Sequence, residues 1–411
     1  MLRFVFSFVF SSLFLLNQVA ADDSNAPNYL FYGYLSHQVI FDSYRSLDSR
    51  DGELYFYPLR ANFDPDGVDL NKKSRLNMVE VQSRFGVRFS QPDLFGAALS
   101  GTLEADFFGT HQDFVRLVRL RQAFVELRWP RHSLLLGNAF HPTFVLECFP
   151  NTLSFASGVP FHPLNRSPQV RYTYQPAANL NMSLSLLTHG YHRSAGPREA
   201  QKNSGLPDTQ FRLQYGDGLI HSMGIVAGYK FLTPRDQTTA GYSTSETIGS
   251  YNVQAYIKRT FPGLILRTEA LYGQNLTSFV MIGGYGIRGR QGEVDLMGDY
   301  SYTNIRTMSA WADLETPSAP FSAGLFLGYS ANLGANHDYI SLPGFNRNDD
   351  LHYIYRIGPR MQYQNRNLVF AFEWNVVGAV YGLEWDSRHR VTQSADPVVN
   401  NHVVFGTKYF F

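Results

Sequence analysis

Arginine is the residue type in this sequence best suited to binding a charged ligand. It supplies most of the 35 basic residues, and pairs such as Arg84 and Arg88 or Arg119 and Arg121 fall on alternate positions of strand-like segments. A guanidinium stays charged and donates paired hydrogen bonds to a carboxylate or phosphate, so this pattern favours anions. The candidate anion-selectivity residues are Arg84, Arg88, Arg119, Arg121, Arg128, Arg166, Arg171, Arg212, Arg356 and Arg360.

The same arginines have a structural interpretation. Acidic residues occur on neighbouring segments, and their ion pairs with the arginines would make the interior rigid without selecting a solute. These acidic residues are Glu80, Glu104, Asp106, Glu126 and Glu269. The two interpretations are compatible, and the sequence leaves both open.

The segment 140–166 is unusually apolar for a connection between strands. It contains many aromatic residues, and Pro142, Pro150, Pro160 and Pro163 stiffen it. An apolar connection of this length requires a surface to cover it. We expect it to fold inward and narrow a channel, although a contact between subunits is the alternative. Its candidate constriction residues are Phe144, Glu147, Phe149 and Phe155, and Glu147 is the only carboxylate in the segment, which favours an anion preference.

Residues for catalysis or metal binding are not grouped in this sequence. The histidines are scattered, the single cysteine is Cys148, and no local signature places a nucleophile beside a base. We therefore expect no enzyme activity, no cofactor and no metal. The net charge of +1 gives no general attraction to nucleic acid.

The elements that position the arginines are predicted from alternation of period two. Between Val79 and Ser90, apolar side chains alternate with polar or charged ones, as in a strand between two different environments. Arg119 and Arg128 fall on the same face of their predicted strand only if one residue bulges near Phe124. The predicted strands are 29–44, 75–90, 97–109, 115–129, 132–139, 167–175, 180–190, 209–216, 220–232, 246–260, 264–273, 301–315, 320–331, 351–364, 368–382 and 401–411.

The connections between these strands alternate between short turns and long segments. The connection 110–114 is the exception, because it is short where the alternation requires a long segment. This asymmetry is typical of outer-membrane barrels, which have short periplasmic turns and longer outer loops. Lipid leaves no backbone polar group unpaired, so such a sheet must close on itself. The sequence predicts an all-β, transmembrane, antiparallel up-and-down barrel of about 16 strands, with 140–166 as its inward-folded third outer loop.

Both ends of the chain agree with export to the outer membrane. Arg3, the apolar run 4–16 and the small residues 19–21 are typical of a signal peptide. We expect residues 1–21 to be the signal peptide and 22–411 to form the barrel. The chain ends in Tyr409, Phe410 and Phe411, an aromatic terminus typical of the last strand of bacterial outer-membrane barrels.

Several short motifs resemble the DcaP-like porins, particularly the related outer-membrane porins of Bacteroidetes. They occur in order over most of the chain: 83–86 (SRFG), 103–109 (LEADFFG), 134–138 (LLLGN), His141-Pro142, 148–150 (CFP), 165–171 (NRSPQVR), 272–276 (YGQNL) and the terminal 409–411 (YFF). The resemblance implies a 16-stranded barrel, passive diffusion and a homotrimer in outer-membrane lipid. DcaP proteins of the original type carry a helical segment before the barrel, and here only residues 22–28 precede the first predicted strand.

Together these features predict a bacterial outer-membrane porin that forms a water-filled channel for passive diffusion of small hydrophilic solutes, with a preference for anions. The alternatives are an outer-membrane barrel enzyme, or an adhesin with an occluded lumen.

Overall fold

The computed structural model describes residues 27–155, 158–317 and 320–411. The barrel wall consists of β1 (Asn28–Asp42), β4 (Arg75–Val79), β5 (Arg84–Leu94), β6 (Ala97–Asp106), β7 (Arg119–Arg128), β8 (His132–Phe140), β9 (Arg166–Ala177), β10 (Leu180–Leu187), β11 (Asp208–Gly216), β12 (His221–Leu232), β13 (Ile248–Phe261), β14 (Leu264–Gln274), β16 (Tyr302–Glu315), β17 (Phe321–Ala335), β20 (Leu351–Asn365), β21 (Leu368–Trp385) and β23 (Val398–Phe410). The predicted signal peptide, 1–21, lies outside the described residues.

The connections carry the remaining short elements. These are β2 (Ser46–Ser49), β3 (Leu54–Pro58), β15 (Gly283–Arg288), β18 (Tyr339–Ile340), β19 (Asn346–Arg347), β22 (Val391–Ser394), the helix α2 (Ala200–Asn203) and the 3-10 helices η1 (Gln112–Phe114) and η2 (Leu276–Phe279). No helix in the described ranges is both long enough and apolar enough to cross a membrane.

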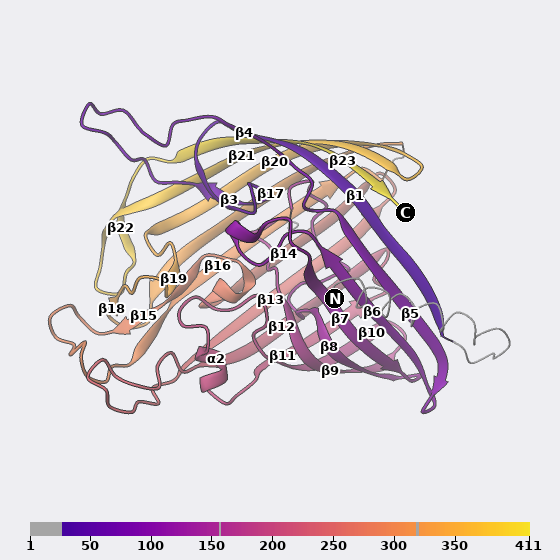
Figure 1. Ribbon diagram of the computed structural model, residues 1–411, viewed down its shortest axis with the longest axis horizontal. Helices are drawn as coiled ribbons and strands as arrows, with labels where there is room; N and C mark the ends of the chain where they lie inside the picture. Colours follow the sequence, from indigo (N-terminus) through magenta and orange to yellow (C-terminus); the bar gives the residue numbers. More distant parts are fainter. Residues whose placement is uncertain (1–26, 156–157, 318–319) are drawn as a thin grey trace, which may run out of the picture.

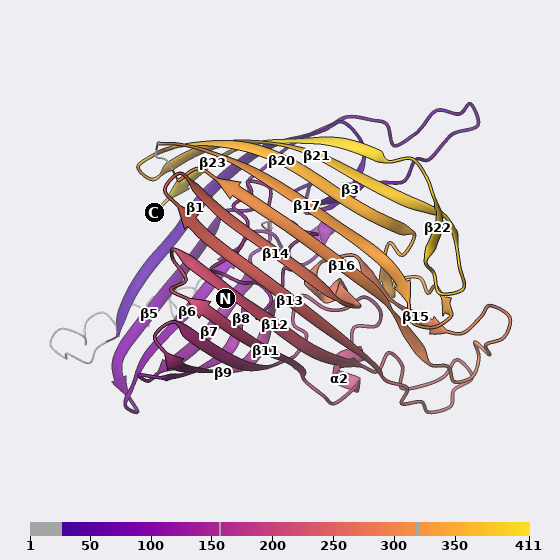
Figure 2. The ribbon, with the colours of Figure 1, turned by 180° about the vertical axis from the view of Figure 1, so that it is seen from behind.

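The wall is a closed antiparallel barrel of 16 strands, in which β4 and β5 together form one interrupted strand. The strands run obliquely around the barrel, with the long connections at the left of Figure 1 and the C-terminus and short turns at the right (Figures 1 and 2). Closure joins β1 to β23, with Tyr34 opposite Phe410. Gly33 and Phe411 exchange backbone hydrogen bonds of 3.1 Å, so the terminal aromatic residue completes the ring.

The predicted strands are confirmed, and the position of one bulge is corrected. The sequence places the bulge of β7 near Phe124. In the structure the register between β6 and β7 shifts between Leu120 and Gln122, so Arg121 is the extra residue. The bulge brings both Arg119 and Arg121 to buried carboxylates on β6.

The two faces of the wall differ in the way that a membrane barrel requires. On β12, Ser222, Val226 and Lys230 are buried inside, whereas Met223 and Tyr229 are exposed on the outside. Large exposed apolar side chains recur on the wall strands all around the barrel. Water would make such a continuous apolar exterior unfavourable, and lipid accommodates it. The apolar exterior therefore agrees with a barrel in an outer membrane.

A barrel closed by backbone hydrogen bonds is expected to resist detergent until it is heated. The folded protein should migrate faster than the boiled protein on a detergent gel, because the closed sheet stays compact. Equal mobility before and after boiling, or a circular dichroism spectrum dominated by helix, would contradict this fold.

Candidate functional site

The segment 140–166, between β8 and β9, contacts wall strands that are not neighbours of its own. The backbone N–H of Asn151 donates to Asp313 on β16 at 3.2 Å. The N–H of Leu153 and the hydroxyl of Ser154 both donate to Glu373 on β21 at 2.6 Å. Asp313 and Glu373 are buried, and besides these contacts Asp313 pairs with Arg360 and Glu373 accepts from Asn375. The segment therefore adds hydrogen bonds to two carboxylates that are already held in the interior.

Apolar side chains of the same segment pack into a buried cluster, hereafter the interior cluster. Its members from the segment are Phe144, Val145, Cys148, Val159, Phe161 and Leu164, and its members from the wall include Tyr256, Trp311, Phe326, Ile354 and Val377. The backbone carbonyl of Phe161 also accepts from Ser309 at 2.8 Å. Burial raises the pKa of the Cys148 thiol to about 12, so this lone cysteine acts as a small apolar core residue.

A second segment, the β2–β3 hairpin (residues 46–58), also joins the interior cluster. Tyr55, Phe56 and Tyr57 are buried within it, and the hydroxyl of Tyr381 donates to the carbonyl of Pro58 at 2.7 Å. This inward position is not predicted from the sequence, in which the residues between the predicted strands 29–44 and 75–90 form one of the long connections. The aromatic run 54–58 was the available signal, because an exposed connection has no physical reason to concentrate aromatic residues.

The tip of this hairpin carries a buried carboxylate. The side-chain amide of Gln82, at the interruption between β4 and β5, donates to Glu53 at 2.7 Å. Burial raises the pKa of Glu53 to about 7. This contact attaches the hairpin tip to the wall.

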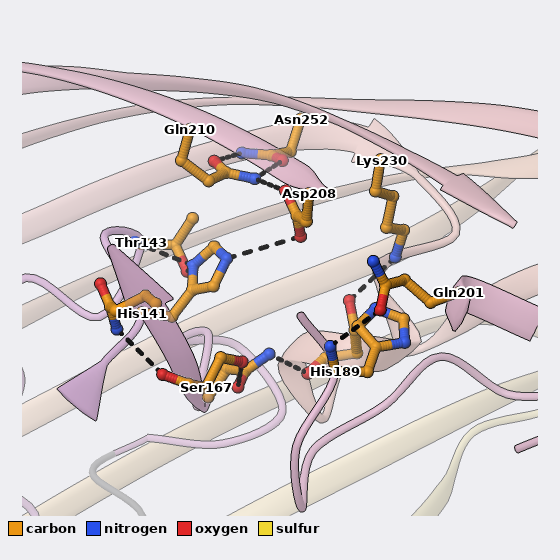
Figure 3. Close-up of polar contacts among 12 residues, drawn as sticks. His141, Thr143, Ser167, His189, Gln201, Asp208, Gln210, Lys230 and Asn252 are labelled. Carbon is orange, nitrogen blue, oxygen red and sulfur yellow. Dashed lines mark hydrogen bonds and ion pairs between the residues drawn. The ribbon is translucent and has the colours of Figure 1, made fainter. Parts of the chain in front are cut away.

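The start of the segment 140–166 is held against the wall by a buried polar network (Figure 3). One ring nitrogen of His141 lies 2.8 Å from the hydroxyl of Thr143, and the other lies 3.7 Å from Asp208 on β11. Gln210 donates to the same carboxylate at 2.7 Å. Burial lowers the pKa of His141, so the ring is neutral at neutral pH and the contact is a polar one.

Lys230 lies beside this network (Figure 3) and connects β12 to two of the long connections. Its ammonium donates to the carbonyl of Asn275 at 2.7 Å, to Ser278 at 2.8 Å and to Ser194 at 3.0 Å. All three donor positions of the buried ammonium are therefore used, as a buried charge requires.

Lys230→Met should destabilise the barrel by roughly 2–4 kcal/mol, because it leaves three acceptors and the nearby Asp208 without their cation. The temperature at which half of the protein loses its fast-migrating gel form measures this loss. Lys258→Met is the matched control, since within the described residues the one hydrogen bond of Lys258 is a 3.3 Å contact to the carbonyl of Gly218. An equal shift for both variants would mean that the Lys230 contacts add nothing.

Most of the predicted arginines form ion pairs. Arg119 contacts Asp106 at 2.8 Å, and Arg121 contacts both Glu104 and Asp106 at 2.7 Å. The remaining ion pairs are Arg84 to Glu104 at 3.9 Å, Arg128 to Glu126 at 2.7 Å, Arg212 to Glu147 at 2.7 Å and Arg360 to Asp313 at 2.5 Å. Arg128 lies near a short turn with its side chain 65% exposed, so it belongs to the rim of the barrel.

The other predicted arginines have no carboxylate partner among the described residues. Arg88 lies over the ring of Tyr32 at 4.4 Å, and Arg171 donates to the carbonyl of Phe140 at 2.6 Å. Arg356 is only 2% exposed and lies over the rings of Tyr55 and Phe161, within the interior cluster. Arg166 is 4% exposed, and its guanidinium lies over the ring of Phe140 at 5.6 Å. In the described part of the chain, its Nη1 has no hydrogen-bond partner and its guanidinium forms no ion pair.

Two cavities meet at Arg166. The outer cavity, lined largely by the long connections, has a volume of about 500 Å³, and the inner cavity has a volume of about 290 Å³. Phe155, Leu164 and Arg166 line both. The charged residues that line the outer cavity are Asp48, Arg50, Arg119, Arg166, Arg193 and Arg347, and those that line the inner cavity are Arg84, Arg121, Arg166 and Lys408.

The candidate constriction residues occupy different places around these cavities. Phe155 packs on Phe108 with ring centroids 4.1 Å apart, while Phe144 and Phe149 line the inner cavity. Glu147 lines neither cavity and pairs instead with Arg212. Burial acts to raise the pKa of Glu147, but the charge of Arg212 lowers that pKa. The carboxylate of Glu147 is therefore neutralised by its ion pair.

Five further charged or titratable residues line the two cavities and are not predicted from the sequence. They are Arg50, Arg193, Arg347, His192 and Lys408. All but Lys408 lie in connections, where no alternation indicates which way a side chain points. Their convergence depends on how three connections pack together, and no local pattern encodes it.

Comparisons with known proteins establish the fold. No protein-family model matches the sequence, and no curated protein matches it. Among solved structures, the outer membrane channel DcaP of Acinetobacter baumannii is 13% identical, covers 95% of this chain and 99% of its own, and gives a TM-score of 0.69. An anion-selective porin from Comamonas acidovorans is 11% identical, covers 94% of this chain and 100% of its own, and gives a TM-score of 0.57.

A third solved structure is OmpT, an outer membrane protein of Vibrio cholerae in a trimer form. It is 10% identical over 94% of this chain and 99% of its own, with a TM-score of 0.57. At these identities the likeness shows that the chain has the fold of bacterial outer-membrane porins. The finer resemblance to members from Bacteroidetes stays a prediction.

Proposed function

We propose that this protein is an exported bacterial outer-membrane porin that lets small hydrophilic solutes diffuse passively and favours anions. The observation that carries the proposal is the pair of cavities that meet at Arg166 inside a closed barrel. A 16-stranded barrel is wide enough to enclose an aqueous channel. The long connections would face the outside of the cell and the short turns the periplasm.

The preference for anions rests on the charges that line the cavities. Cationic side chains line both, and Asp48 is the single carboxylate among the described lining residues. Charged side chains that line a narrow, weakly polar passage act on a permeating ion more strongly than they would in bulk water. An anion that moves from the outer to the inner cavity meets cations at each step, whereas a cation is repelled.

The segment 140–166 and the β2–β3 hairpin would narrow the channel. Their contacts with Asp313, Glu373 and Tyr381 on distant strands support an inward position. The alternative for the aromatic residues of 140–166 is a contact between subunits. The burial of Phe144 and Phe161 against the barrel's own Trp311 and Phe326 favours the inward position within one chain.

The extent of the interior cluster also favours one competing hypothesis, a barrel with an occluded lumen. Recording from the purified protein in a planar lipid bilayer separates the two. A porin is expected to give stepwise increases in current as single channels insert, whereas an occluded barrel gives none. Failure to conduct in a protein that is still heat-modifiable would overturn the proposed function and leave the fold intact.

A homotrimer is the proposed assembly, on the basis of the sequence resemblance. The apolar exterior of the barrel would face lipid over most of its circumference and the other subunits over the rest. The mass of the unheated protein in detergent, measured by light scattering with the detergent subtracted, distinguishes a trimer from a monomer.

A further inference from the structure

The outer cavity holds more cationic side chains than nearby carboxylates neutralise. Arg119 is paired with Asp106 by two hydrogen bonds of 2.8 and 3.1 Å, and the carboxylate of Asp48 lies 3.1 Å from Arg75. The lining arginines without a carboxylate partner in the described ranges are Arg50, Arg166, Arg193 and Arg347. A single monovalent anion would leave this cavity strongly positive, so an anion with more than one charge fits it better.

Three lining residues also carry buried hydrogen-bonding atoms without a partner in the described structure. These atoms are Nε of Arg50, Nη1 of Arg166 and Nε2 of His192. The three residues are 8%, 4% and 9% exposed. A buried donor without an acceptor destabilises the protein by about 1–3 kcal/mol. A ligand with acceptor oxygens would remove that penalty for the two guanidinium donors, and for His192 in the tautomer protonated on Nε2.

Serine hydroxyls add further donors. Ser194 and Ser278 line the outer cavity, and each oxygen accepts a hydrogen bond from the ammonium of Lys230. Ser49, which also lines the cavity, accepts from Arg50 at 3.0 Å. Because each oxygen already accepts from a cation, its own proton is available to donate to a ligand. The described residues provide no acceptor for these three protons.

We propose that the outer cavity binds the phosphate group of a small phosphate monoester before the solute passes Arg166. The inference rests on the proposed channel function and specifies its substrate class. A phosphate monoester carries a charge of about −1.5 to −2 at pH 7 and three strong acceptor oxygens. A carboxylate carries one charge on two oxygens. The number of unpaired arginines and free donors matches the phosphate more closely.

The dimensions of the cavity indicate that the ligand is organic. A volume of about 500 Å³ is far larger than an inorganic phosphate ion requires. Phe56, Phe108 and Tyr191 form part of its lining. These rings provide flat walls against which the carbon skeleton of the solute would pack while the arginines hold the phosphate.

The test measures how added solutes reduce the chloride current of single channels in planar bilayers. Glucose 6-phosphate is the phosphate monoester. Glucarate has two carboxylates on six carbons, and gluconate has one. Glucose 6-phosphate is expected to block the current saturably, at a half-blocking concentration about tenfold below that of glucarate, and gluconate should block least.

Two variants locate the block in the outer cavity. Arg166→Gln combined with Arg347→Gln should raise the half-blocking concentration of glucose 6-phosphate about tenfold or more, because two unpaired guanidiniums are lost. Ser194→Ala combined with Ser278→Ala should weaken the block by glucose 6-phosphate more than the block by glucarate. Arg290→Gln is the matched control, because Arg290 pairs with Asp338 outside the cavity lining. Heat-modifiability confirms that each variant is folded.

Each outcome is decisive. Equal blocking by glucose 6-phosphate and glucarate would overturn the phosphate assignment and leave a site for divalent anions. A channel that prefers anions but shows no saturable block would overturn the binding site alone. A channel that prefers cations would overturn the proposed function itself.

Discussion

Deleting residues 151–158 in a Glu373→Gln background should raise single-channel conductance roughly twofold or more, because the segment 140–166 is proposed to be the main obstruction in a barrel of this width. The deletion removes the contacts of Asn151, Leu153 and Ser154 with the opposite wall. Glu373→Gln is included because the deletion would otherwise leave a buried carboxylate whose remaining contact is with Asn375. Conductance is read from insertion steps in planar bilayers.

The control for this deletion is the removal of residues 62–69, an equally long stretch of the exposed connection between β3 and β4. That stretch lines neither cavity, so its removal should leave conductance unaltered. If 140–166 instead contacts another subunit, deleting 151–158 should weaken oligomers on native gels without changing the conductance of each channel. That pattern would move Phe144, Phe149 and Phe155 from the channel to the subunit interface.

The second large effect is expected from reversing the charge at Arg166. Arg166→Glu should lower the ratio of chloride to potassium permeability about tenfold, which corresponds to about 1.4 kcal/mol in the relative barriers for the two ions. Arg166 is the appropriate position because it lines both cavities and has no carboxylate partner in the described chain. Removing Arg121 would instead break its ion pairs with the buried Glu104 and Asp106, so the effect could not be assigned to one cation alone.

Arg290→Glu makes the same charge change on an exposed connection and should leave the permeability ratio nearly unchanged. If Arg166→Glu behaves like this control in a folded, conducting protein, the arginines of the two cavities are structural. The proposed preference for anions would then lose its support.

The wall strands of the barrel could be predicted from the sequence because each one depends on the alternation of neighbouring residues. Each wall strand separates lipid from a polar interior, so side chains such as those of Met223 and Lys230 must alternate along the chain. The position of the bulge in β7 could not be predicted as reliably. The apolar and charged pattern around Phe124 tolerates several phases, and the ion pairs of Arg121 with Glu104 and Asp106 determine which residue is extra.

The interior could be predicted only in part. Arginines on wall strands were found because alternation shows which face they occupy. Their partners could not be assigned, and Arg356 proved to lie among aromatic rings. Arg50, Arg193 and Arg347 come from three different connections, and only the packed structure brings them to one cavity. Long-range packing of this kind leaves no periodic signal in the sequence.

The central claim is that this barrel is a channel that favours anions. The reversal potential of the wild-type protein in a planar bilayer, with potassium chloride at different concentrations on the two sides, tests it most directly. The cations around Arg166 predict a potential whose sign shows that chloride is more permeant than potassium. A potential of zero or of the opposite sign, from channels with measurable conductance, would contradict that claim.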